Sequence, residues 1–197
     1  VNSIVDTLYL GTFKRAYSIL SPSLSGLGLD AKSAAAPDVA KANKLLEEAG
    51  WTLGADGIRV KDGKRLTLTD AELTGNTEKR HDIVTFLQQQ WKQIGVELKM
   101  EVLPSGGYVE TLGKGNYDVA GGGVTGNDPD GIRTKLASDN QNGLYNTGQI
   151  IDSEIDQWLK EGYQEGDKNK RKQIYNQIEQ KVADQSYYIP IYQLSYN

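Results

Sequence analysis

The chain of 197 residues contains no cysteine, which excludes disulfide frameworks, zinc–thiolate sites and thiol nucleophiles. It contains one histidine, His81, which any Ser-His-Asp triad would have to use. No motif near His81 places a nucleophile on a sharp turn, and no second metal ligand stands four positions further on. We therefore expect an exposed surface histidine, and we expect no catalytic residue, no metal site and no cofactor.

Two further absences concern partners. No apolar run approaches the about 18 residues of a membrane-spanning helix, and no basic segment followed by an apolar one opens the chain, so we expect no direct membrane insertion. Basic residues are not in excess either, because 22 Lys and Arg stand against 26 Asp and Glu, for a net charge of -4. A nucleic-acid partner usually requires a basic stripe that displaces counterions from phosphates, so we expect none.

The chain also lacks an initiating methionine. It begins Val1-Asn2-Ser3 and runs at once into an apparent helix, IVDTLYLG (4–11), so we expect a piece excised from a longer protein. Its length is that of one ordinary domain, enough to bury about 70% of the surface of the unfolded chain. The prediction is a single domain over residues 1–197.

Helical and strand periods alternate along the chain. Helices are predicted for 37–50, 76–95, 108–112, 153–163 and 170–185, and strands for 96–102, 117–120 and 187–196. Asp38 is placed to cap the first of these helices and Gly50 to end it, and Asp62-Gly63 predicts a type I′ turn within a hairpin at 58–69. This succession predicts an α/β fold with a mixed or parallel sheet flanked by helices, and the Ser- and Gly-rich residues 18–37 are typical of a surface loop.

Apolar side chains recur at helical spacing and should form the core. The expected buried residues are Ile83, Val84, Leu87, Trp91 and Ile94, then Ile155, Trp158 and Leu159 with Tyr163 as a further candidate, and finally Ile174, Ile178 and Val182. Tyr108, Tyr117 and Tyr145 lie near predicted loop or strand ends, where tyrosines can line a cleft. Most of the 11 tyrosines are nevertheless expected to be half-buried packing residues.

Four glycines stand close together in YDVAGGGVTGNDPDG (117–131). Gly121, Gly123 and Gly126 match the G-x-G-x-x-G spacing of dinucleotide-binding loops. That fingerprint requires a helix that begins within the motif and an acidic residue about 20 positions further on, at the end of a strand, and neither is found here. The run therefore indicates either exposed backbone, open to a ligand or another chain, or a flexible turn that needs positive φ.

The order of several segments carries a resemblance to a known family. These segments are KANKLLEEAGW (41–51), NTEKRHDIVTFLQQQWKQIGVELKMEVLP (76–104), GNYDVAGGGVTGNDPDG (115–131) and DSEIDQWLKEGYQEGDKNKRKQIYNQIEQKVADQSYYIPIYQ (152–193). Together they resemble the C-terminal lobe of the bacterial extracytoplasmic solute-binding proteins of family 5, the oligopeptide, dipeptide and nickel-type receptors of ABC importers. The opening IVDTLYLGTFKRAYSILSPS (4–23) resembles the helix and following loop of the same family, so the resemblance covers nearly the whole chain.

The resemblance implies one lobe of a type II periplasmic-binding-protein-like clamshell, in which the ligand is buried between two lobes. It implies a missing N-terminal lobe of the same protein, an ABC transporter permease that the intact protein would meet, and a receptor without catalytic activity. It also implies an extracytoplasmic location, either periplasmic or lipid-anchored at the outer face of the cell membrane. A peptide is the expected ligand, with sugars, opines and metal chelates left open.

The resemblance also assigns a site. In peptide-binding members the loop after the matching strand lays its backbone along the ligand and commonly reads Gly-Trp-x-x-Asp, with the Asp on the α-ammonium of the ligand. The matching region gives the ligand-binding residues Gly122, Gly123, Val124, Thr125, Asn127 and Asp128. Val124 stands at the Trp position and Asn127 at the Asp position. Asp128 either replaces the ammonium partner or caps the helix that begins near Pro129.

Two other classes of function remain open. One is a nucleotide-dependent enzyme that uses the glycine loop 121–126, and the other is a protein-interaction module whose open strand edge pairs with another chain. The carboxylate pairs Asp128/Asp130 and Glu154/Asp156 have the spacing of a possible acid and base, but their places near helix starts favour capping and helix-dipole interactions.

Overall fold

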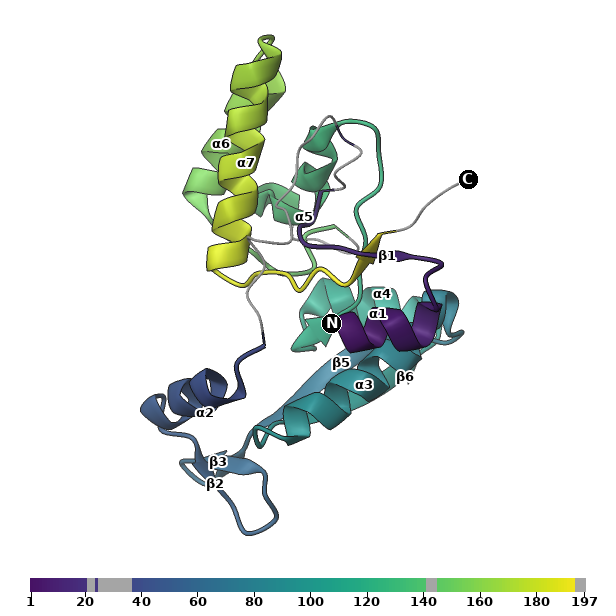
Figure 1. Cartoon of the computed structure of the whole chain (residues 1–197), viewed down its shortest axis with the longest axis vertical. Coiled ribbons are helices and arrows are strands. Elements are labelled where there is room, and N and C mark those ends of the chain that lie inside the picture. Colours follow the sequence, from purple (N-terminus) through teal and green to yellow (C-terminus); the bar gives the residue numbers. More distant parts are fainter. Residues whose placement is uncertain (21–23, 25–36, 141–144, 194–197) are drawn as a thin grey trace. The chain divides into compact units, whose positions relative to one another are not determined.

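The structure, a computed structural model, describes residues 1–20, 24, 37–140 and 145–193 (Figure 1). Contacts between Cα atoms divide the chain into two compact units. Residues Ala36–Gly121 form the sheet unit, and Val1–Ala35 together with Gly122–Asn197 form the helical unit. The single lobe expected over 1–197 stays a prediction, and most of the loop expected at 18–37 lies outside the described residues.

The sheet unit is built on parallel strands in the order β6-β5-β7. The central strand β5 (Thr67–Leu73) pairs along its whole length with β6 (Glu97–Leu103), from Thr67 opposite Glu97 to Leu73 opposite Leu103. On its other side β5 pairs with the two-residue strand β7 (Val119–Ala120). Parallel neighbours require crossover connections, which α3 (Arg80–Lys92) and α4 (Ser105–Lys114) provide. The predicted α/β fold is confirmed.

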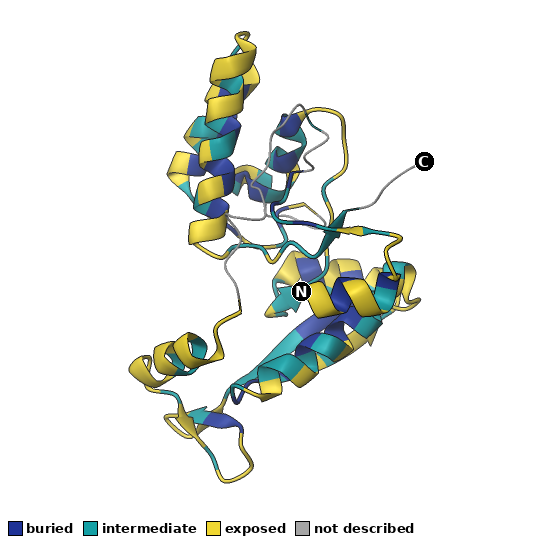
Figure 2. Ribbon diagram, viewed as in Figure 1, coloured by how far each residue is buried: buried dark blue, intermediate teal, exposed yellow. Residues whose placement is uncertain are grey.

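The helices of this unit bury the faces that their apolar spacing predicts. In α3, which follows the 3-10 turn η1 (Thr77–Lys79), the buried residues are Ile83, Val84 and Leu87 (Figure 2). Trp91 and Ile94 are only half-buried. In α4, Tyr108 and Leu112 form a core cluster with Ala71 of β5, so Tyr108 is a packing residue.

An antiparallel sheet, β2-β3-β4, and one helix precede β5. The strands are β2 (Thr52–Leu53), β3 (Arg59–Lys61) and β4 (Lys64–Arg65), and the helix is α2 (Val39–Glu48). Asp38 caps α2 as predicted, because its side chain accepts a hydrogen bond from the Lys41 N–H. Asp62 and Gly63 have φ of 49° and 73°, which confirms the predicted type I′ turn. None of the residues of α2 is buried.

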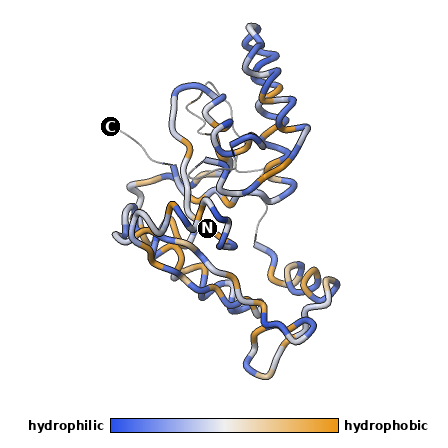
Figure 3. The backbone as a smooth tube through the Cα atoms, turned by 180° about the vertical axis from the view of Figure 1, so that it is seen from behind, coloured by the Kyte–Doolittle hydropathy of each residue, from blue (hydrophilic) through white to orange (hydrophobic). Residues whose placement is uncertain are grey.

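The helical unit begins with α1 (Asn2–Tyr9) and a short antiparallel pair, β1 (Lys14–Arg15) with β8 (Tyr192–Gln193). Before β8 along the chain, this unit also contains η2 (Pro129–Ile132), α5 (Arg133–Leu136), η3 (Ser138–Asn140), α6 (Ser153–Gln164) and α7 (Lys168–Asp184). The turn between α6 and α7 is hydrophilic in Figure 3 and consists mainly of exposed residues. Within the described residues, no helix is both long and apolar enough to cross a membrane.

The core of the helical unit lies between α6, α7 and the short helices after residue 128. Its buried side chains include Ile132, Leu136, Ile155, Leu159, Tyr175, Ile178 and Val182. The predicted burial of Tyr163 is wrong, since this side chain is 70% exposed. The aromatic residue buried in this core is instead Tyr175 of α7. Gly162 of α6 leaves room for its ring, since a Cβ on Gly162 would lie 2.9 Å from the ring.

Candidate functional site

The predicted ligand-binding residues lie in an exposed stretch that begins directly after β7 and Gly121. Gly122, Gly123, Thr125 and Asn127 are exposed, and Val124 is half-buried against the core of the helical unit. Open α/β sheets bind their ligands beyond the carboxyl ends of their strands, and this stretch follows such an end. We call residues 122–127 the glycine segment.

Among the described residues, no hydrogen-bond partner is recorded for the N–H and C=O groups of the glycine segment. A Cβ added at Gly122 or Gly123 would meet nothing within 4 Å, so crowding inside the chain does not demand glycine there. Gly126 has a φ of 139°, a conformation that favours glycine. The structure therefore shows exposed backbone at 122–123 and a positive φ at 126.

Gly121 differs from the glycines that follow it. A Cβ on Gly121 would lie 3.0 Å from Oε1 of Glu72 and 3.6 Å from the side chain of Arg80. The hydroxyl of Tyr108 donates a long hydrogen bond of 3.5 Å to the Gly121 carbonyl. Close neighbours within the sheet unit thus explain the glycine at 121.

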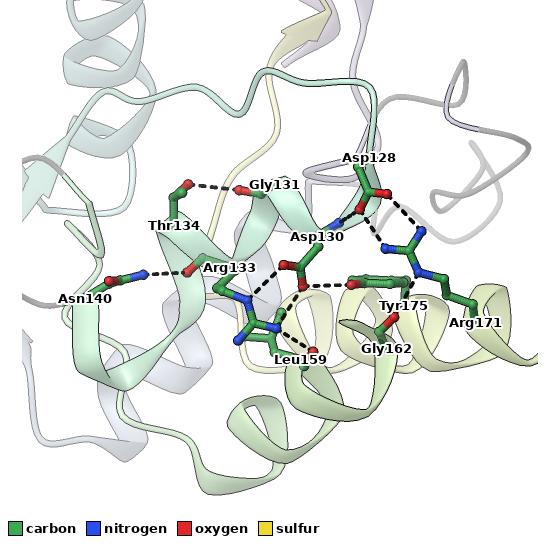
Figure 4. Close-up of polar contacts among 10 residues, drawn as sticks. All are labelled: Asp128, Asp130, Gly131, Arg133, Thr134, Asn140, Leu159, Gly162, Arg171 and Tyr175. Carbon is green, nitrogen blue, oxygen red and sulfur yellow. Dashed lines mark hydrogen bonds and ion pairs between the residues drawn. The ribbon is translucent and has the colours of Figure 1, made fainter. Parts of the chain in front are cut away.

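Asp128, at the end of the glycine segment, is held by two kinds of contact (Figure 4). Its Oδ1 accepts a hydrogen bond of 2.8 Å from the Asp130 N–H and so caps η2. The guanidinium of Arg171 donates to both carboxylate oxygens, with Nη2–Oδ1 at 2.7 Å and Nη1–Oδ2 at 2.9 Å. The hydrogen bonds from Arg171 hold the pKa of Asp128 below its usual value. Of the two roles left open for Asp128, capping is present in the structure, and contact with a ligand stays a prediction.

The same network ties η2 to the α6–α7 pair (Figure 4). Asp130 accepts a hydrogen bond of 2.8 Å from the Tyr175 hydroxyl and two of 2.9 Å from Arg133. Burial and the hydrogen bond to Asp130 raise the pKa of Tyr175. The carboxylates of Asp128 and Asp130 thus accept hydrogen bonds from two arginines and a tyrosine, which fits a structural role.

The other acidic pair has similar partners. Glu154 forms an ion pair with Lys181, and the carboxylate of Asp156 accepts a hydrogen bond of 2.9 Å from the Ser138 N–H. Both contacts lie within the helical unit and fit a structural role at the start of α6.

The sequence singled out three other residues, His81, Tyr145 and Tyr117, which the structure also describes. His81 is half-buried rather than exposed, because its Nε2 lies 2.8 Å from the carbonyl oxygen of Leu73, which corrects the expectation of a surface histidine. Tyr145 is 56% exposed, and Tyr117 is half-buried beside the Ala71 cluster. Within the described ranges, no group of three or more His, Asp and Glu side chains could hold a metal ion.

The sequence interpretation missed a buried acidic pair on β5. Asp70 and Glu72 are 2% and 3% exposed, and Oδ1 of Asp70 has no hydrogen-bond partner among the described residues. Burial, followed by the charge of Glu72, raises the pKa of Asp70 to about 7, and burial raises the pKa of Glu72. Two acids alternating with Ala71 in LTLTDAEL are the signal that was available, since a strand with both faces covered is normally apolar.

The surroundings of the glycine segment do not resemble a nucleotide site. Gly126 is followed by η2 and by α5, which has four residues, so no long helix begins within the motif. Two hollows of about 300 and 320 Å³ lie elsewhere, one beside Ile58 and Leu98 and the other beside Glu161 and Ile174. The glycine segment lines neither of these two hollows.

Sequence comparison finds the same region in known proteins. The family described as "Bacterial extracellular solute-binding proteins, family 5 Middle" matches residues 1–143. The chain is 32% identical over 156 residues to the oligopeptide-binding protein AppA of Bacillus subtilis (strain 168), which covers 77% of this chain and 28% of that protein. It is 31% identical over 99 residues to the nickel-binding periplasmic protein of Escherichia coli (strain K12), covering 50% of this chain and 18% of that protein.

Solved structures agree. The structure of AppA from Bacillus subtilis in complex with a nonapeptide is similar with a TM-score of 0.80 and 29% identity, over 97% of this chain and 38% of that one. NikA from Brucella suis in complex with Fe(III)-EDTA shares the fold, with a TM-score of 0.82 at 22% identity over 98% of this chain and 39% of that one. The fold is that of a bacterial solute-binding protein. The chain belongs to family 5 of the bacterial extracellular solute-binding proteins, and the matches cover 18% to 39% of the length of these relatives.

Proposed function

We propose that this chain is part of the ligand-binding lobe of an ABC-importer substrate-binding protein, and that the glycine segment binds a peptide through its main chain. One observation carries the proposal: residues 122–127 are largely exposed, and their N–H and C=O groups have no recorded partner among the described residues. An extended peptide can pair with such a segment as an added strand, because main-chain hydrogen bonds supply affinity whatever the side chains are.

The composition of the segment supports the same ligand class. Gly-Gly-Val-Thr-Gly-Asn carries no charged side chain, so the segment offers main-chain groups, one hydroxyl and one carboxamide. These groups match the peptide units of a ligand rather than a charge at one of its ends. The nonapeptide in the similar AppA structure supports a peptide as the ligand here.

The intact protein would act as a receptor and not as an enzyme. Its other lobe would supply the opposite wall of the cleft, and closure about the ligand would exclude water before delivery to a permease. We place the intact protein outside the cytoplasm, either in the periplasm or lipid-anchored at the outer face of the cell membrane. Because half of the cleft would be absent, residues 1–197 alone should bind peptide weakly or not at all.

A pair of variants at one position tests the proposal in the intact protein. Thr125→Pro removes a main-chain N–H of the glycine segment, whereas Thr125→Ala removes only the hydroxyl. With a pool of random nonapeptides, mass spectrometry of the retained peptides should show affinity about threefold to tenfold lower for Thr125→Pro, equivalent to one hydrogen bond. Thr125→Ala should lower affinity less than Thr125→Pro does, because it keeps the main-chain N–H. Equal affinity of all three proteins would refute main-chain binding by this segment.

A further inference from the structure

Within the part of the chain that the structure describes, few recorded contacts fix the path of the glycine segment. Val124 packs against the core of the helical unit, and the next side chain held in place is that of Asp128. Glycines lose more conformational freedom on ordering than other residues. When a binding loop becomes ordered only on ligand binding, this loss of entropy lowers the affinity for the ligand. Whatever holds Asp128 therefore bears on how well the segment is prepared for a ligand.

Arg171, from α7, holds Asp128 through a complete guanidinium fork (Figure 4). Nη1 and Nη2 donate to the two carboxylate oxygens at 2.9 and 2.7 Å, and Nε donates to the Gly162 carbonyl of α6 at 2.8 Å. The guanidinium carbon also lies 5.3 Å from the centre of the Tyr175 ring. One side chain thus joins the end of the glycine segment to both long helices of its unit.

This geometry differs from that of an ordinary surface ion pair. Exposed pairs with one contact often contribute little, because holding two long side chains in one arrangement is unfavourable. Here the side chain of Arg171 is 26% exposed, and it donates two parallel hydrogen bonds to Asp128. A third hydrogen bond, from Nε to the Gly162 carbonyl of α6, fixes the orientation of the guanidinium. A lysine provides one point charge and cannot make this planar set of bonds.

We propose that Arg171 is a positioning residue for ligand binding: by clamping Asp128 against α6 and α7 it fixes the end of the glycine segment, and peptide affinity depends on it although it does not touch the peptide. The proposal rests on the proposed function of the segment. It assigns Asp128 to this clamp, so that the neighbouring main chain, and not the carboxylate of Asp128, meets the ligand.

The experiment uses the intact protein and the random nonapeptide pool, at a temperature well below thermal unfolding. Arg171→Ala should lower affinity about tenfold, and Arg171→Lys, which keeps the charge, should lower it less. Lys172→Ala is the matched control, because it removes the same charge from the next residue of α7, which is exposed and has no recorded contact with any described residue. Its affinity should be unchanged.

Two readouts separate positioning from stability. Thermal unfolding of each variant identifies loss of fold, and Arg171→Lys serves as the folded test if Arg171→Ala does not fold. A purely structural role would lower the unfolding temperature and leave affinity unchanged in the folded protein, which would overturn the proposal. If Thr125→Pro weakens binding and both Arg171 variants bind normally, the positioning role is wrong and the proposed function stands. If Thr125→Pro binds normally, the proposed function itself fails.

Discussion

Asp128 and Arg171 stand 43 residues apart in the sequence and form a two-bond ion pair, with N–O distances of 2.7 and 2.9 Å. The carboxylate of Asp128 also caps η2, so a single side chain serves the local turn and a distant helix. Each role has its own consequence for stability, and substitutions at Asp128 separate them.

Asp128→Ala removes the cap and the ion pair together. We expect the free energy of unfolding to fall by about 1 kcal/mol, the usual effect of losing a helix cap. Asp128→Asn keeps an oxygen that can accept the Asp130 N–H and should cost less. Urea unfolding of the chain measures both differences. An Asn variant that is less stable than the Ala variant would contradict this division of roles.

Asp70 should make stability depend on pH. Its pKa is raised from 3.8 to about 7 in the folded chain, so the folded state keeps a proton that the unfolded state releases. The stability from this group is therefore complete below about pH 4 and is lost as pH rises to about 7, by at most about 4 kcal/mol. Urea unfolding at pH 5 and pH 8 should show this fall in the unmodified chain.

Asp70→Asn supplies the comparison for that measurement. Asparagine does not ionise, so the variant should lose most of the fall between pH 5 and pH 8 and should be the more stable protein at pH 8. Glu72, with its own raised pKa, remains as a weaker source of pH dependence. An unchanged pH slope in Asp70→Asn would show that Asp70 is not the responsible group.

Arg59 should be among the residues most sensitive to substitution in the sheet unit. Its side chain is 1% exposed and donates to the carbonyls of Trp51 and Ile94 at 2.7 and 2.8 Å and to Asn43 at 2.9 Å. Arg59→Met leaves these acceptors without a donor, at a cost of about 3 kcal/mol. The control, Arg65→Met, changes an exposed arginine and should alter unfolding little. Similar losses for both would contradict the role of burial.

Two helical glycines should respond oppositely to alanine. A Cβ on Gly162 would lie 2.9 Å from the ring of Tyr175, so Gly162→Ala should lower the free energy of unfolding by about 1–3 kcal/mol through overpacking. A Cβ on Gly113, in α4, would meet nothing within 4 Å, so Gly113→Ala should raise it by up to about 1 kcal/mol. Thermal unfolding of the two variants distinguishes these signs, and destabilisation by Gly113→Ala would be evidence against the open space there.

Local signals in the sequence predicted local structure well. The cap Asp38 and the turn Asp62-Gly63 depend on residues within a few positions of one another, and both are present. The sequence analysis ended the strand at Thr69, whereas β5 continues to Leu73. Asp70 and Glu72 hid this continuation, because a buried parallel strand normally contains no acidic residues. The length of α4 was underestimated, since the Gly106-Gly107 pair in its first turn is unfavourable in a helix.

The sequence analysis predicted no side-chain contact between residues far apart in the chain. The periodicity of α6 favoured a buried Tyr163, but Gly162 admits the ring of Tyr175 from α7. The clamp on Asp128 could not be read from the sequence either, because its partner Arg171 is one of several basic residues in KNKRK (168–172). What the sequence did predict at the site is the exposed backbone of Gly122 and Gly123, since residues without a Cβ leave the main chain accessible.

The parallel arrangement around β5 has a consequence for how the chain folds. The β3–β4 hairpin pairs residues that flank the turn at Asp62-Gly63. In contrast, the contacts of β5 with β6 join residues 30 positions apart, and its contact with the segment before β7 joins residues 49 positions apart. Closing such long loops precedes any gain from strand pairing, so the sheet should assemble late and slowly compared with the β3–β4 hairpin. Until then the unpaired edge of β5 is exposed, and in a refolding experiment this strand is where intermolecular association should begin.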